Sequence, residues 1–89
     1  MSRGERRFNN RVEKNEKVEL HWTDATHQTF QMAGMLADLS PSGARLLLDR
    51  PVPLNTALRL TLASHEKSGT VRYCTKGIRG YTVGVLFDS

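Results

Sequence analysis

Short runs of alternating apolar and polar residues constrain the fold of this chain most strongly. A half-buried strand gives this pattern, because its successive side chains point to opposite faces. Six such runs follow one another, with turn-forming residues between them and no long helical pattern. They fall within residues 17–23, 29–39, 44–48, 58–62, 70–75 and 81–87. The sequence therefore predicts an all-β domain, built as a barrel or a sandwich.

Residues 29–39 are also compatible with a helix, because Met, Leu and Ala favour that conformation. Gly34 lies in the middle of the run. A glycine at such a position is typical of a strand with a bulge or a close backbone approach. We therefore predict a strand here.

Residues 70–75 form a shorter run in which strict alternation places Val71 and Tyr73 on one face. Arg72 and Cys74 then lie on the other face. Tyr73 fits an ordinary core position as well as a surface position, and Cys74 is expected to be a small apolar filler.

The positive charge of the chain gathers near its N-terminus. Residues 1–17 contribute +3 of the net charge of +4, from six Lys or Arg against three Glu. A polyanion-binding domain more often spreads its basic residues along one face, so this distribution favours a small anionic ligand. Because residues 1–16 lack apolar periodicity, we predict a flexible basic arm over 1–16 and a β-domain over 17–89.

No apolar stretch approaches the ~20 residues of a membrane span, and the first residues do not resemble a secretion signal. We therefore expect a cytoplasmic protein without membrane contact. The three histidines (His21, His27 and His65) lack metal-ligand spacing with one another or with Cys74, the single cysteine. Since no catalytic Ser-His-Asp or Cys-His set is recognisable either, we expect no metal, no cofactor and no enzymatic activity.

A polar corner, Asp-Leu-Ser-Pro-Ser-Gly at residues 38–43, separates two of the apolar runs. Ser40 suits the first position of a β-turn, Pro41 the second and Gly43 the fourth. In such a loop Asp38 and Ser40 are available for hydrogen bonds, and a carboxylate matches the two N–H donors of the guanine Watson–Crick edge. The corner is therefore a candidate guanine-binding site, although the same residues also suit a turn that only caps its own backbone.

Arginines near the N-terminus supply the second candidate site. A guanidinium is always charged, binds phosphate or the O6 and N7 atoms of guanine through two bonds, and stacks on bases. In an extended chain Arg7 and Arg11 lie up to roughly 13 Å apart, which suits a ligand of dinucleotide size. The alternative is a solvated tail that nearby Glu residues partly neutralise.

Taken together, Arg7-x-x-x-Arg11 and Asp38-x-Ser40-x-x-Gly43 resemble the two signatures of the PilZ domain, a bacterial receptor module for cyclic di-GMP. The resemblance extends over nearly the whole chain, since residues 69–74 and 83–87 are similar to the late strands of the family. It implies a six-stranded antiparallel barrel of the split-barrel type. Family members usually add a C-terminal helix, whereas this chain has little or none, so an open barrel end, a covering partner and a longer protein all remain possible.

The resemblance also implies roles for individual residues. Arg7 and Arg11 would contact phosphates and bases, while Asp38, Ser40 and Gly43 would read a guanine. Arg6, immediately before the matched pair, is associated in the family with two intercalated ligand molecules. Tyr73 lies where relatives often place an aromatic residue near the base. Exposed arginines at positions 45 and 72 either line the rim of this site or are merely solvated.

The predicted function is thus a cyclic di-GMP sensor that signals to a protein partner, with motility, surface or polysaccharide outputs implied by the family. One alternative is a small OB-like protein that binds single-stranded RNA, which the high pI of about 9.7 favours. The scarcity of aromatic residues argues against it, because base stacking needs them. The other alternative is a PilZ-like interaction module that binds no nucleotide.

Overall fold

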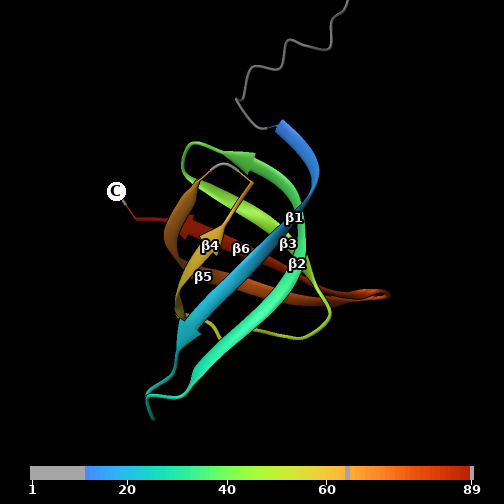
Figure 1. Cartoon of the computed structure of the whole chain (residues 1–89). Coiled ribbons are helices and arrows are strands. Elements are labelled where there is room, and N and C mark those ends of the chain that lie inside the picture. The colour runs from blue at the N-terminus through green and yellow to red at the C-terminus, as the bar shows by residue number, and fades with distance from the viewer. Residues whose placement is uncertain (1–11, 64, 89) are drawn as a thin grey trace, which may run out of the picture.

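Six antiparallel strands form a closed barrel in the computed structural model, which describes residues 12–63 and 65–88 (Figure 1). The strands are β1 (Val12–Thr23), β2 (Thr29–Ser40), β3 (Gly43–Leu48), β4 (Ala57–Thr61), β5 (Glu66–Gly77) and β6 (Gly80–Phe87). Their order around the barrel is β1-β2-β3-β6-β5-β4. The predicted six-stranded antiparallel barrel is confirmed, and the described residues contain no helix.

Since the described parts of the chain form strands, turns and loops, they offer no helix that could cross a membrane.

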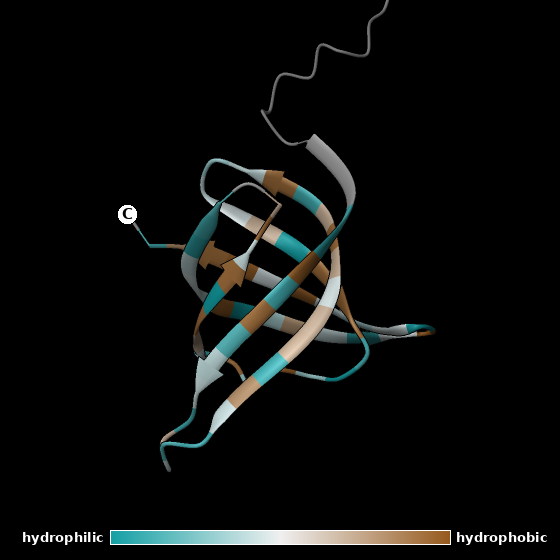
Figure 2. Ribbon diagram, viewed as in Figure 1, coloured by the Kyte–Doolittle hydropathy of each residue, from teal (hydrophilic) through white to brown (hydrophobic). Residues whose placement is uncertain are grey.

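The core consists of the inward positions of the alternating runs, together with Val52 from the loop between β3 and β4. Along β3, Ala44, Leu46 and Leu48 are buried, while Arg45 and Leu47 are exposed. The same alternation of apolar and polar residues is visible along β1 in Figure 2. The remaining buried apolar side chains are Val18, Leu20, Trp22, Leu36, Val52, Leu58, Leu60, Leu62, Val71, Val83 and Val85. Because burial of one large aliphatic side chain contributes about 1.5–3 kcal/mol, this core supplies the main driving force for folding.

Strand β1 is held unequally by its two neighbours. It pairs with β2 through ten residue pairs but with β4 through only three, from Glu19–Thr61 to His21–Arg59. The seam that closes the barrel is therefore short, and β1 is held mainly by β2.

Residues 29–39 form a strand, as predicted, and not a helix. A Cβ atom at Gly34 would lie 2.8 Å from the carbonyl oxygen of Leu47, so the predicted close backbone approach is also confirmed. Two strands begin at least four residues earlier than predicted. Strand β1 begins at Val12, so residues 12–16, assigned to the arm, belong to the barrel; the rest of the arm lies outside the described residues. Strand β5 begins at Glu66, within residues predicted as a turn.

A bulge in β5 overturns the predicted faces of residues 70–75. Val71 pairs with Val85, and Tyr73 pairs with the preceding residue of β6, Gly84, so Arg72 is an extra residue. Because side chains alternate with a period of two, one extra residue moves those after it to the opposite face. Tyr73 is accordingly 42% exposed, while Cys74 packs against the core.

Candidate functional site

The polar corner is a tight hairpin turn between β2 and β3. Ser40 pairs with Gly43, and Pro41 and Ser42 form the turn between them, which confirms the predicted β-turn. The Ser40 hydroxyl donates to the carbonyl oxygen of Gly43 at 3.4 Å. The carbonyl oxygen of Ser42 accepts a hydrogen bond of 2.8 Å from the backbone N–H of Phe87. The corner is therefore fixed to the end of β6 as well as to its own two strands.

Gly43 has a packing role that the sequence does not reveal. A Cβ atom at this position would lie 2.3 Å from the carbonyl oxygen of Val85 on β6. Any larger residue would therefore push β3 and β6 apart. Glycine is required here by the approach of the two strands, whether or not a ligand also approaches the backbone.

Asp38 differs from its predicted environment. It lies within β2 rather than in an open loop, its side chain is only 2% exposed, and it forms an ion pair with Arg45 on β3. In this ion pair Nη2 of Arg45 donates to Oδ2 of Asp38. The side chain of Arg45 remains 46% exposed. A buried carboxylate thus lies against a guanidinium that also reaches the surface.

Direct pairing connects the corner to Tyr73 through one row of residues across the barrel wall. Asp38 pairs with Arg45, Arg45 with Gly84, and Gly84 with Tyr73. Directly paired residues share a face, so their side chains lie about 4.5–5.5 Å apart at Cβ. A Cβ atom at Gly84 would lie 2.2 Å from Cε2 of Tyr73, so the tyrosine ring lies directly over this glycine.

Every register irregularity recorded for the described residues borders this row. The three irregularities fall between Glu13 and Glu16 on β1, between Leu36 and Asp38 on β2, and between Val71 and Tyr73 on β5. Bulges of this kind re-aim side chains and are over-represented beside functional sites. Here they place Asp38 and Tyr73 on the outer wall, where strict alternation would not put them.

A pocket at this wall contains three of the predicted site residues. Ser40, Gly43 and Tyr73 line it together with Arg45 and Arg72. The other lining residues are Ser42, Ala44, Gly84, Val85 and Leu86. Asp38 does not line the pocket; it lies behind Arg45. Arg45 and Arg72, for which the sequence left open a place at the rim or simple solvation, thus both line the pocket. Gly84 also belongs to the site, and the sequence did not predict it, because cross-strand pairing cannot be read from one strand alone.

The predicted arginines Arg6, Arg7 and Arg11 lie outside the described residues. The start of β1 nevertheless shows where the chain that carries them joins the barrel. Val12 pairs with Leu39 and Glu13 pairs with Asp38. In Figure 1 the start of β1 and the β2–β3 corner accordingly lie at the same end of the barrel. The residue after Arg11 is therefore a direct neighbour of the polar corner.

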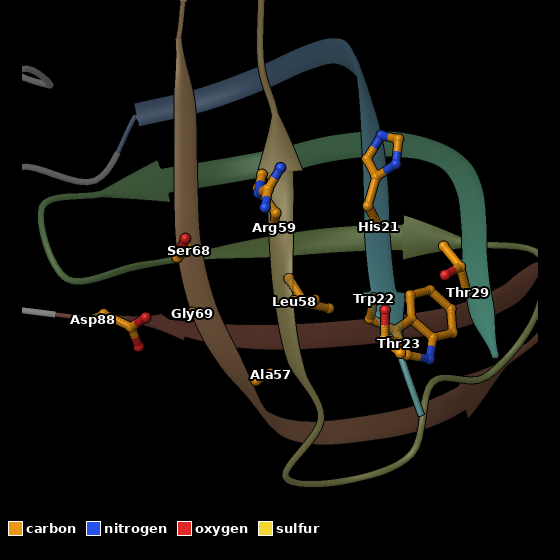
Figure 3. Close-up of a pocket in the computed structure, with 10 residues that line it drawn as sticks. All are labelled: His21, Trp22, Thr23, Thr29, Ala57, Leu58, Arg59, Ser68, Gly69 and Asp88. Atoms are coloured by element: carbon orange, nitrogen blue, oxygen red, sulfur yellow. The ribbon is translucent and has the colours of Figure 1, made fainter. Parts of the chain in front are cut away.

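A second pocket lies on another side of the barrel, where β1 and β4 stop pairing (Figure 3). His21 and Arg59 line its rim, and Trp22 and Leu58 follow them toward the interior. Nε2 of His21 lies 3.4 Å from Oε1 of Glu19. This pocket contains none of the residues predicted to bind ligand. Within residues 12–63 and 65–88, no group of three His, Cys, Asp or Glu side chains could hold a metal ion.

Comparison with known proteins confirms the family resemblance of the sequence. No curated protein matches the chain. The sequence model of the PilZ domain matches residues 5–89, a range that includes Arg7, Arg11 and the whole barrel. The chain therefore belongs to the PilZ domain family, which is a family of cyclic di-GMP receptor domains rather than of catalytic ones.

Proposed function

We propose that this chain is a cytoplasmic cyclic di-GMP sensor whose N-terminal arginines close over the β2–β3 corner when ligand binds. The observation that carries the proposal is the register of β1 on β2. It brings the residue after Arg11 beside Leu39, next to the pocket that contains Ser40, Gly43 and Tyr73. Val12, which directly follows the first signature in the sequence, thus lies beside the corner that contains the second.

Each part of the site matches one part of the ligand. Arg7 and Arg11 bind the phosphates and the base faces, because guanidinium groups form paired, charge-assisted hydrogen bonds with phosphate. Asp38 and Ser40 accept and donate hydrogen bonds at a guanine edge. The exposed ring of Tyr73 offers a flat surface for a base, and stacking of one base on an aromatic ring contributes about 1–3 kcal/mol.

Ligand binding would be converted into a signal by the arm. Ordering residues 1–11 costs conformational entropy, and the contacts with the two phosphates offset this cost. The ordered arm then presents a surface that the free protein lacks, to which a downstream protein binds. Family resemblance suggests outputs in motility, surface properties or polysaccharide production.

Calorimetric titration with cyclic di-GMP tests the site directly. Because hydrogen bonds to charged groups contribute about 1.5–3 kcal/mol, Arg11→Ala should weaken binding by about ten- to a hundredfold. Arg59→Ala is the matched control, since Arg59 is an exposed arginine on β4. Equal affinities of wild type and Arg11→Ala would remove the arm from the site, and the absence of binding to the wild type would refute the proposed function.

The same titration measures how many ligand molecules bind. If Arg6 supports a pair of intercalated molecules, the wild type takes up two per chain. Arg6→Ala should then reduce the stoichiometry to one while a single molecule still binds. A stoichiometry of one for the wild type would contradict this assignment.

A PilZ-like interaction module without a nucleotide is the second candidate function. It is favoured by the structural roles of Gly43, which packs against Val85, and of Asp38, which pairs with Arg45. The motif residues would therefore stabilise the barrel even in a protein that binds no ligand. The RNA-binding alternative has less support, because Tyr73 is the single aromatic residue among the large exposed hydrophobic side chains of the described residues.

A further inference from the structure

The ion pair between Asp38 and Arg45 obstructs a guanine that would form hydrogen bonds with the Asp38 carboxylate. The Asp38 side chain is 2% exposed, and Arg45 occupies its Oδ2 atom. Arg45 lines the pocket at the corner, whereas Asp38 does not. A molecule that enters this pocket therefore meets the guanidinium before it meets the carboxylate.

A buried carboxylate is stable only while its charge is compensated by a cation or by hydrogen-bond donors. The guanine Watson–Crick edge provides two N–H donors and can take the place of one guanidinium contact. Arg45 would then be released from Oδ2 while it still lies within the pocket. A released guanidinium binds phosphate oxygens, or the O6 and N7 atoms of guanine, through two parallel hydrogen bonds.

We infer that Arg45 is a ligand-binding residue, which lies on Asp38 before ligand binds and transfers to a phosphate or a guanine of the ligand when a guanine edge occupies Asp38. This inference rests on the proposed function and names one more contact of the same site. The exchange keeps both charged groups hydrogen-bonded throughout, because the guanine N–H donors replace the guanidinium on Asp38 while the guanidinium binds acceptor atoms of the ligand.

The surroundings of Arg45 allow this movement. Its direct neighbour on one side is Asp38, and its direct neighbour on the other side is Gly84, which has no side chain. The ring of Tyr73 lies over Gly84. Neighbouring strands are about 4.8 Å apart, so the Tyr73 ring above Gly84 lies within reach of the long Arg45 side chain. A base on the Tyr73 ring would lie beside the released guanidinium.

The inference is tested by titrating cyclic di-GMP into wild type, Arg45→Ala, Arg45→Lys and the control Arg59→Ala. We expect Arg45→Ala to raise the Kd by about ten- to a hundredfold, since a charge-assisted contact is lost. Arg45→Lys should have an intermediate affinity, because an ammonium group keeps the charge but lacks the planar fork. Arg59→Ala should bind as the wild type does.

A second measurement follows the wild type itself and needs only the conservative variant Arg45→Lys, for assignment. The Nε–Hε resonance of Arg45, assigned by its absence in Arg45→Lys, should shift on addition of cyclic di-GMP, whereas that of Arg59 should not. A residue that only stabilises β2 against β3 would lower the thermal midpoint when replaced but would leave the Kd of the folded protein unchanged.

The outcomes separate the two claims. If the wild type binds cyclic di-GMP but Arg45→Ala binds equally well and the Arg45 resonance does not move, the role of Arg45 is refuted and the proposed function stands. Tighter binding by Arg45→Ala would show that Arg45 only competes with the ligand for Asp38 and does not bind the ligand itself, which also refutes the inference. If the wild type does not bind at all, both claims fail. A weakened Arg45→Lys together with a shifted Arg45 resonance supports the inference even if Arg45→Ala does not fold.

Discussion

Two walls of the barrel differ in how regularly their strands pair. The wall of β2, β3, β6 and the later part of β5, which we call the motif wall, contains the row from Asp38 to Tyr73. The wall formed by β1 and β4 between Glu19 and His21, which we call the plain wall, pairs without any register shift. The side chains of the plain wall alternate strictly, with Leu20 and Leu60 inside.

The walls also differ in what they expose. Four large hydrophobic side chains of the motif wall reach the surface, namely Met35, Leu47, Tyr73 and Leu86. The outward residues of the plain wall are polar or charged, among them Glu19, His21 and Arg59. A sheet that serves only the core can follow one simple pattern, whereas a sheet that also builds a site departs from it. Departures from alternation therefore mark the side of this barrel where function is expected.

The largest effect on stability should come from the plain wall. Leu60 is completely buried, so Leu60→Ala should lower the free energy of unfolding by about 2–5 kcal/mol. The row from Asp38 to Tyr73 does not include β4, so the folded variant should bind cyclic di-GMP as the wild type does. Chemical denaturation and calorimetric titration below the unfolding transition measure the two quantities. A changed Kd would show that the walls are coupled.

Gly84→Ala, on the motif wall, should weaken ligand binding but change the stability little. The three atoms nearest to the added methyl group all belong to the ring of Tyr73, which can move, so the cost in stability should be at most about 1 kcal/mol. Because Tyr73 loses its position above residue 84, we expect binding to weaken by about tenfold, as for the loss of a stacking contact. Gly77→Ala is the control, since a Cβ atom there comes no closer than 3.7 Å to its nearest neighbour. Equal Kd values for the two variants would contradict the role of Tyr73.

Deletion of Arg72 would remove the bulge of β5 while it keeps the strand in register. Val71 and Tyr73 would become consecutive opposite Val85 and Gly84, so Val71 and Cys74 stay inside and Tyr73 stays outside. We expect the barrel to remain folded and ligand binding to weaken more than in Arg72→Ala, which keeps the bulge. Amide spectra report the fold and titration reports the Kd. If both variants bind equally, the bulge itself contributes nothing beyond the Arg72 side chain.

The smallest effect is expected at the turn between β1 and β2. The Asp24 carboxylate accepts hydrogen bonds from the Thr26 hydroxyl at 2.7 Å and from the backbone N–H groups of Thr26 and Gln28. The side-chain bond from Thr26 is the main cause that lowers the pKa of Asp24 below its usual value.

Since this pKa is lowered on folding, the charged group contributes stability above the pKa of the unfolded chain, and the contribution is lost as the pH falls through the lower pKa of the folded chain. Asp24→Asn should therefore reduce the thermal midpoint slightly near neutral pH, and the difference from the wild type should vanish in strong acid. A difference that persists in acid would assign the effect to turn geometry instead of charge. Ligand binding should be unaffected at any pH at which both proteins are folded.

Sequence reasoning predicted the fold well because alternation is a local signal. The burial of Val18, Leu46, Leu58 and Val83 follows directly from the period of two. The turn at residues 40–43 was also predictable, since Pro41 and Gly43 have fixed conformational preferences.

The site was predictable only in part. Ser40, Gly43 and Tyr73 meet at one pocket as expected, yet the face assigned to Tyr73 was wrong and the side chain of Asp38 is buried against Arg45. The face of Tyr73 depends on a bulge, and a bulge depends on how a strand fits its partner and leaves no clear mark in its own sequence. The ion pair of Asp38 with Arg45 likewise depends on register between strands. The contribution of Arg6, Arg7 and Arg11 stays a prediction.

The hydrogen bond from Phe87 to Ser42 has a practical meaning for anyone who labels this protein. It places the end of β6 against the corner, and the exposed Leu86 lines the pocket there, so a fluorophore at position 86 would sit close to the expected ligand and should respond to its arrival. A dye on Ala25 would be a suitable reference, since the twelve residues of β2, at about 3.3 Å each, place that turn roughly 40 Å along the strand from the corner. For the same reason, a bulky tag fused after residue 89 is best removed before affinities are compared.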